Sequence, residues 1–126
     1  MSGIAITKTI LAQLNNNENI TKIVGDKIFP IVADDGTTFP FILLKKNGMT
    51  TIYTKTGAVN DVINFTIEVV DNKYSRAVQI AEEIRKTIER QKYDEIINCE
   101  IQNTTEEYVA DTYIISQLYK IQIINE

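Results

Sequence analysis

The sequence of 126 residues has no histidine and no tryptophan, and it has a single cysteine, Cys99. Histidine is the side chain that most often acts as a general base near neutral pH and most often binds transition metals. One cysteine cannot form a thiolate zinc site or an intrachain disulfide bond. We therefore expect a protein that is not an enzyme and that has no catalytic residue, no cofactor and no bound metal.

Long apolar runs and basic clusters are absent as well. The longest apolar run, residues 39–44, is far shorter than the roughly 20 residues that cross a bilayer, so we expect no membrane partner. The net charge is −4, and basic residues are adjacent only at Lys45-Lys46 and Arg85-Lys86. A tight nucleic acid ligand requires a basic surface that displaces counterions from phosphates, so none is expected. The absence of a basic segment before the first apolar residues favours a cytoplasmic product.

The carboxylate pairs and the glycines carry no motif of known chemistry. Adjacent carboxylates occur at Asp34-Asp35, Glu82-Glu83 and Glu106-Glu107, on predicted loops or on the solvent-facing side of a predicted helix. A carboxylate that acts as an acid or base near neutral pH needs burial or a crowded like charge, and neither is predicted here. The glycines are too widely spaced for a GxGxxG or Walker loop. We interpret the pairs as solvated charge and predict no nucleotide site.

The spacing of apolar residues predicts both helices and strands. Helical spacing covers residues 4–14, a short turn around 20–24 that Gly25 ends, and a long helix over 73–90. Asp71 or Asn72 is the expected N-cap of the long helix. Alternating or short β-prone apolar segments predict strands. These segments lie at residues 28–32, 41–46, 50–54, 61–70, 97–101 and 113–123.

The order of these elements predicts the fold class. Short connections between consecutive strands favour antiparallel pairing, and helices with one apolar face favour a layer on one side of the sheet. We expect an α+β fold, with a mostly antiparallel sheet and two main helices packed on one face, in a single domain over residues 1–126. Cys99 and Tyr119 are expected in the core, where Cys99 would be a small apolar residue and not a nucleophile. The long helix is expected to contribute Tyr74, Ala77, Val78, Ala81, Ile84 and Ile88.

Both prolines of the chain follow a phenylalanine, at the two ends of an acidic loop that contains Asp-Asp-Gly-Thr-Thr. Proline cannot donate a hydrogen bond to a sheet, so Pro40 suits the first residue of a strand and Pro30 suits an edge strand or a bulge. Each proline also restricts the residue before it, here Phe29 and Phe39, to an extended conformation. We therefore expect this loop to be stiff at both ends.

The segment after residue 46 predicts a protruding arm. Residues 48–60 contain one β-prone piece and no sustained apolar pattern, and we interpret them as a long, mobile hairpin. Three apolar or aromatic residues of this arm, and Tyr108 before the last strand, have no obvious partner within the chain. Tyrosine is favoured at protein interfaces. The candidate interface residues are Met49, Ile52, Tyr53, Lys55 and Tyr108.

The order of these segments resembles one known family. An N-terminal helix is followed by ITKIVGDKIFP, FPFILLKK, the long strand VINFTIEVVD, the helix YSRAVQIAEEIRKTIE and the last strand YIISQLYKIQI. In this order the segments resemble the small tail-completion, or tail-terminator-like, head-tail joining proteins of long-tailed bacteriophages and prophages. The resemblance extends from about residue 4 to residue 124.

The resemblance implies a structural role without catalysis. The protein would cap the tail tube and form part of the joint to the head, as a ring for which we expect six copies. Its partners would be copies of itself, the tail tube protein and the head-tail connector proteins, and the genome would pass through the ring. A net acidic subunit would let DNA slide past without sticking. The protein would lie in the bacterial host cytoplasm during assembly and in the tail or neck of the virion afterwards, with residues 48–60 reaching a neighbouring copy or the tail tube.

A second interpretation stays open at this point. Domains made of a sheet and helices host many functions, so the fold class does not decide between them. The alternative is a small non-enzymatic ligand-binding or regulatory module of a bacterium, with its ligand held between helix and sheet. A ring would have several times the mass of one chain, whereas a ligand module should be a monomer or dimer that its ligand stabilises.

Overall fold

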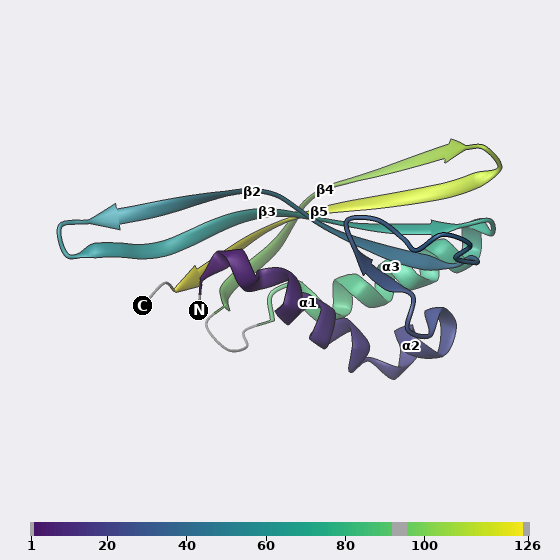
Figure 1. Cartoon of the computed structure of the whole chain (residues 1–126), viewed down its shortest axis with the longest axis horizontal. Coiled ribbons are helices and arrows are strands. Elements are labelled where there is room, and N and C mark those ends of the chain that lie inside the picture. Colours follow the sequence, from purple (N-terminus) through teal and green to yellow (C-terminus); the bar gives the residue numbers. More distant parts are fainter. Residues whose placement is uncertain (1, 92–95, 125–126) are drawn as a thin grey trace.

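In residues 2–91 and 96–124, which the computed structural model describes, five strands form one sheet and the helices lie on one face of it (Figure 1). The strand order is β1-β2-β3-β5-β4, and neighbours are antiparallel except β1 and β2, which are parallel. The mostly antiparallel sheet and the α+β class are confirmed. The strands are β1 (Ile28–Pro30), β2 (Phe41–Thr54), β3 (Gly57–Asp71), β4 (Ile96–Val109) and β5 (Thr112–Ile124).

The helices begin and end near the predicted residues. A 3-10 turn, η1 (Gly3–Ala5), leads into α1 (Ile6–Asn15), where the run of asparagines ends the helix as expected. The side chain of Asn17 caps α2 (Glu18–Val24) by accepting a hydrogen bond from the backbone N–H of Asn19 at 2.8 Å. Gly25 follows with a φ of 66°, a conformation that glycine adopts without a steric penalty. The long helix is α3 (Tyr74–Ile88).

The core lies between the helices and the sheet. Cys99 and Tyr119 are both fully buried there, as the sequence predicts. A bulge between Ile96 and Asn98 shifts the predicted alternation of β4, so that Ile96 and Cys99 both face the core. Core residues come from α1 (Ile6, Ile10, Leu14), from α3 (Ala77, Ile80, Ala81, Ile84, Ile88), from β3 (Ile63, Phe65, Ile67, Val69) and from β5 (Ile115, Tyr119, Ile121, Ile123), among others.

Two predictions about α3 were wrong. Tyr74 is not a core residue, because its side chain is 44% exposed and its ring contacts the ring of Tyr113 at a centroid distance of 5.4 Å. Ile80, which was not among the predicted core residues of this helix, is buried. The N-cap residue is Lys73 rather than Asp71 or Asn72. The Asp71 carboxylate accepts a hydrogen bond from the Lys73 N–H at 3.3 Å, so it supports the helix start from two residues upstream.

The segment predicted as a protruding hairpin arm is a β hairpin, which confirms that part of the prediction. Strands β2 and β3 pair from Phe41↔Val70 to Thr54↔Gly57, with register shifts after Lys46 and after Ile52. Lys55 and Thr56 form the turn. We call residues 48–60 the first arm. The predicted strands at residues 41–46, 50–54 and 61–70 all lie within β2 and β3. Both strands are longer than predicted, because residues that are exposed on both faces of a strand show no apolar alternation.

A second hairpin was not predicted. Strands β4 and β5 pair as far as Val109↔Thr112, and the turn residues Ala110 and Asp111 have φ values of 53° and 60°. Positive φ at both central residues is typical of a type I′ turn, which most often has Asn-Gly or Asp-Gly, so Ala-Asp gave no signal. We call residues 103–118 the second arm. The two arms project toward opposite ends of the molecule (Figure 1).

The Phe-Pro steps flank the edge of the sheet. Pro30 ends the short edge strand β1, and Pro40 directly precedes β2, as expected for residues that cannot donate to a ladder. The ring of Phe41 contacts both phenylalanines, with centroid distances of 6.5 Å to Phe29 and 6.0 Å to Phe39. The two ends of the loop are therefore held to the start of β2 by aromatic contacts.

Candidate functional site

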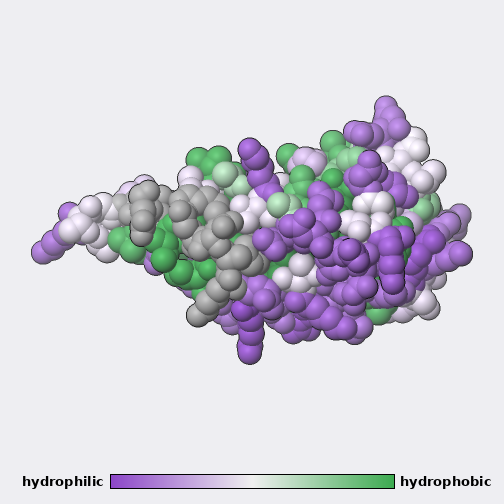
Figure 2. Space-filling model, turned by 90° about the horizontal axis from the view of Figure 1, so that it is seen from below, coloured by the Kyte–Doolittle hydropathy of each residue, from purple (hydrophilic) through white to green (hydrophobic). Residues whose placement is uncertain are grey.

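The two arms, and a cleft between α3 and the second arm, are the surface features considered as sites of interaction. The surface seen from the helix side is mostly hydrophilic over the helices, and the first arm forms the narrow projection at its left end (Figure 2). Among the described helices, none combines the length and apolar character needed to cross a membrane. In residues 2–91 and 96–124, no group of three or more Cys, Asp and Glu side chains is arranged to hold a metal ion.

The tip of the first arm presents apolar and aromatic groups beside a single charge. Tyr53 is 73% exposed and Ile52 is 44% exposed. Lys55, which is exposed in the turn, is the only charged residue within residues 48–60. In the described part of the chain, no ion pair or hydrogen bond involves its ammonium group. The tip therefore combines groups suited to an interface with a cation that has no partner among the described residues.

The base of the first arm is anchored to the N-terminal turn. The Asp61 carboxylate accepts hydrogen bonds from the Gly3 N–H at 2.7 Å and from the Thr51 hydroxyl at 2.8 Å. Met49 packs here, because a Cβ placed on Gly3 would lie 2.7 Å from the Met49 sulfur. Lys46 donates to the carbonyl of Ile4 at 3.0 Å. Met49 thus differs from the other candidates of this arm, because it packs against the N-terminal turn of the same chain.

Tyr108 lies at the other end of the molecule, in the second arm. The sequence suggested no partner for it, but its ring contacts Tyr113 at a centroid distance of 4.7 Å. Its hydroxyl donates to the Asp111 carboxylate at 3.1 Å, and this bond is the main reason that its pKa is raised. Tyr108 is still 59% exposed. The five candidate residues therefore form two separate surfaces, with four on the first arm and one on the second.

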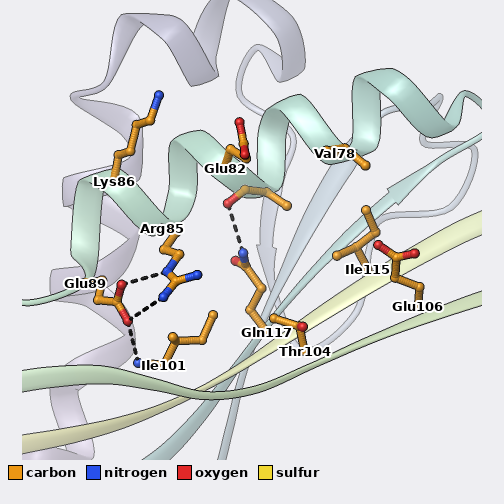
Figure 3. Close-up of a pocket in the computed structure, with 11 residues that line it drawn as sticks. Val78, Glu82, Arg85, Lys86, Glu89, Ile101, Thr104, Glu106, Ile115 and Gln117 are labelled. Atoms are coloured by element: carbon orange, nitrogen blue, oxygen red, sulfur yellow. Dashed lines mark hydrogen bonds and ion pairs between the residues drawn. The ribbon is translucent and has the colours of Figure 1, made fainter.

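A cleft of ≈ 400 Å³ separates α3 from the second arm (Figure 3). Its floor includes Gln117, whose side-chain amide donates to the Ala81 carbonyl at 2.9 Å. The apolar lining residues are Val78, Ala81, Ile101 and Ile115. Sequence analysis did not predict this cleft, because it depends on how far the second arm diverges from the helix.

Polar contacts bound the cleft at both ends. Toward the start of α3, the Tyr74 hydroxyl donates to Glu106 at 2.8 Å, and this bond is the main reason that the pKa of Tyr74 is raised. Toward the end of α3, Glu89 accepts from the Arg85 guanidinium at 2.7 Å and from the Ile101 N–H at 3.1 Å. These bonds join α3 to β4 on either side of the opening.

We expect Glu89 to make stability depend on pH. The hydrogen bond from Arg85 lowers its pKa below the usual 4.5, the Ile101 N–H also lowers it, and burial opposes both. A lowered pKa stabilises the fold above the ordinary value, and this stability is lost as pH falls through the folded-state pKa. Glu89→Gln should reduce the free energy of unfolding by about 1 kcal/mol at neutral pH. Urea titrations below pH 4.5 should show this difference shrinking, whereas Asp35→Asn, at an exposed loop position, should change little at either pH.

Cys99 should be unreactive while the protein is folded. It is fully buried, and burial, followed by the charges of Glu89 and Glu100, raises its pKa to about 12. Because the thiolate is the reactive form, labelling by a thiol reagent at pH 8 should be at least about a hundredfold slower than in the urea-unfolded chain. Thr54→Cys on the first arm gives an exposed control that should label at once. Rapid labelling of native Cys99 would contradict the buried position.

The exposed arms, the cleft and the α+β frame define a small protein suited to contacts with other proteins. Comparison with known families is consistent with this class: residues 8–124 match the model of the family "Tail completion protein gp17", and the chain belongs to that family. It therefore has a structural role in a phage tail.

A solved structure shares this fold. The chain is similar to one from a structure described as "Virion of native gene transfer agent (GTA) particle", with a TM-score of 0.80 and 15% sequence identity. The alignment covers 92% of each chain. None of the curated protein sequences compared with the chain matches it.

Proposed function

We propose that this protein caps the tail tube and helps to join the tail to the head, as a ring of identical copies. Membership of the tail completion family is the observation that carries the proposal. The whole of residues 1–126 would act as one domain without enzymatic activity. The partners would be other copies of the chain, the tail tube protein and the head-tail connector proteins.

The positions of the arms support a ring. A closed ring requires a heterologous contact, in which one surface of a subunit meets a different surface of the next. The two arms differ in chemistry, since the first has a lone cation at its tip and the second has Glu106 and Glu107. They also project in opposite directions (Figure 1). A subunit of this kind can contact one neighbour through each end.

The net charge of the chain supports a channel for DNA rather than a DNA-binding surface. At −4 per subunit, six copies would repel phosphates on average. DNA would then pass through the ring without binding tightly to it. In an infected or induced host, assembly would occur in the cytoplasm, and the finished ring would remain in the tail or neck of the virion.

Two measurements test the proposal. Sedimentation of the purified protein should give a species close to six times the 14.3 kDa of one chain, at least at high concentration or when tail tubes are added. Electron microscopy of gold-labelled protein mixed with tail tubes should place the label at one end of each tube. Label distributed along the tubes, or no binding at all, would contradict the capping role.

The cleft gives a reason to test the ligand-binding alternative too. It lies between a helix and the sheet, where such a module would hold its ligand. A ligand that binds only the folded state raises the melting temperature. If the protein is strictly monomeric and a screened metabolite raises its melting temperature, the ligand-binding alternative is favoured over the ring.

A further inference from the structure

We propose that the tip of the first arm of one copy docks in the cleft between α3 and the second arm of the next copy, with Lys55 paired to Glu82. This inference rests on the proposed ring and names the contact that would hold it together. Its occupant is a second copy of this chain, and the argument depends on charge, apolar surface and position.

The α3 rim of the cleft carries one carboxylate that is available to a cation, that of Glu82, which points away from the second arm (Figure 3). Glu82 is exposed, and no ion pair or hydrogen bond within the described ranges involves its side chain. Each of the other charged groups at the cleft has at least one partner among the described residues. Arg85 pairs with Glu89 at 2.7 Å, Lys86 lies 3.8 Å from Glu83, and Glu106 accepts from Tyr74. A cation at this rim can therefore pair with Glu82 without displacing an existing partner.

The tip of the first arm carries the matching groups. Lys55 is its only charge, and the exposed Ile52 and Tyr53 precede it on β2. The cleft offers Val78, Ile101 and Ile115 as apolar lining for such side chains. Its volume of ≈ 400 Å³ falls within the roughly 300–1,000 Å³ of sites that enclose a small ligand, so it can receive side chains of a hairpin turn. Protein interfaces commonly combine an apolar, buried centre with polar and charged contacts at the rim, which is the arrangement proposed here.

The geometry requires that the contact form between copies. The first arm points away from the second arm and from the cleft beside it, so a chain cannot insert its own tip (Figure 1). Each copy therefore has one tip to offer and one cleft to fill. Such a contact repeats head to tail, and it closes when the rotation between neighbours matches a ring.

A charge exchange tests the pair. Lys55→Glu places two carboxylates together, and Glu82→Lys places two ammonium groups together, so each variant should raise the concentration for half-assembly at least tenfold. The double variant, with the charges exchanged, should recover most of the wild-type assembly. Lys8→Glu on α1 makes the same change in net charge as Lys55→Glu at an exposed position away from both surfaces. It should assemble like the wild type.

Disulfide trapping gives a second measurement that does not depend on charge. Tyr53→Cys combined with Val78→Cys should form covalent ladders of several copies on oxidation, while either substitution alone should not. Cys99 can stay, because it is buried. Wild-type rings with an unaffected Lys55→Glu variant and no ladder would overturn the docking and leave the ring intact. A wild-type protein that is monomeric under all conditions, including with tail tubes, would overturn the ring as well.

Discussion

Replacing residues 52–60 by the two residues Asn-Gly, as a turn between Thr51 and Asp61, should give a folded monomer that no longer forms rings. Thr51 and Asp61 are directly opposite each other in the β2-β3 register, so a two-residue turn can connect them without changing the pairing below. The change removes Ile52, Tyr53 and Lys55 together. If the first arm makes the contact between copies, no assembled species should remain.

The fold should survive this change because the core lies elsewhere. The Gly3 N–H and the Thr51 hydroxyl still reach the Asp61 carboxylate, so the base of the arm keeps its anchor. Ile52 and Tyr53 are largely exposed in the single chain, and removal of exposed side chains usually changes stability by less than about 1 kcal/mol. Urea unfolding should therefore be nearly unchanged while the sedimentation profile changes completely.

A substitution at the base of the first arm serves as a control. It distinguishes the effect of any change in this arm from the effect of losing the residues at its tip. A Cβ added at Gly48 would have no heavy atom within 4 Å, so Gly48→Ala adds a methyl group in open space. The tip of the arm is unchanged in this variant. It should assemble normally. Rings of unchanged mass and stability in the shortened variant would show that the first arm is not the assembly contact.

The second large effect is a loss of stability on substitution of Arg76. Its guanidinium donates two hydrogen bonds of 2.6 Å to the two oxygens of Asp71, and the Asp71 carboxylate is fully buried. Arg76→Ala would leave that buried charge without its cation. Breaking a buried pair costs about 3–5 kcal/mol, and because the Arg76 side chain is 32% exposed we expect the lower end, about 3 kcal/mol.

Arg85 on the same helix is the matched control. It also pairs with a carboxylate through its Nε at 2.7 Å, but its side chain is 55% exposed and that of Glu89 is 19% exposed. Exposed pairs contribute up to about 1 kcal/mol, so Arg85→Ala should have a much smaller effect. Chemical denaturation of both variants at neutral pH measures the difference. Equal losses would mean that burial of the carboxylate does not set the strength of these pairs.

The parts of the fold that pack against apolar neighbours could be predicted from the sequence. Alternation in β3 and the helical spacing of α3 both report burial on one face, and Cys99 and Tyr119 were assigned to the core on that basis. The arms carried no such signal, because exposed strands have no buried face to pattern. The Ala110-Asp111 turn lacked glycine or asparagine, so β4 was expected to be much shorter than it is.

The exposure of the candidate interface residues could be predicted only in part. Exposed apolar and aromatic residues in an unpatterned segment indicated the first arm, where Ile52 and Tyr53 are indeed exposed. In the sequence, Glu82 could not be distinguished from other charged residues on the solvent-facing side of a helix. Its place at the cleft depends on the divergence of the second arm from α3, which is a property of sheet twist and not of local sequence.

The continuity of β3 has a mechanical consequence. From Asn60 to Val70 this strand is hydrogen-bonded to β2 on one side and to β5 on the other, and it leads directly to Asp71 and the start of α3. With about 3.3 Å per residue, its 15 residues extend over about 45–50 Å. Because β3 is continuous and paired on both sides, a force on the tip of the first arm is transmitted along this strand to α3. This helix forms one side of the cleft at the other end of the molecule. Subunits linked tip to cleft would share strain around the ring, so that force from an attached head is spread over all copies instead of opening one joint.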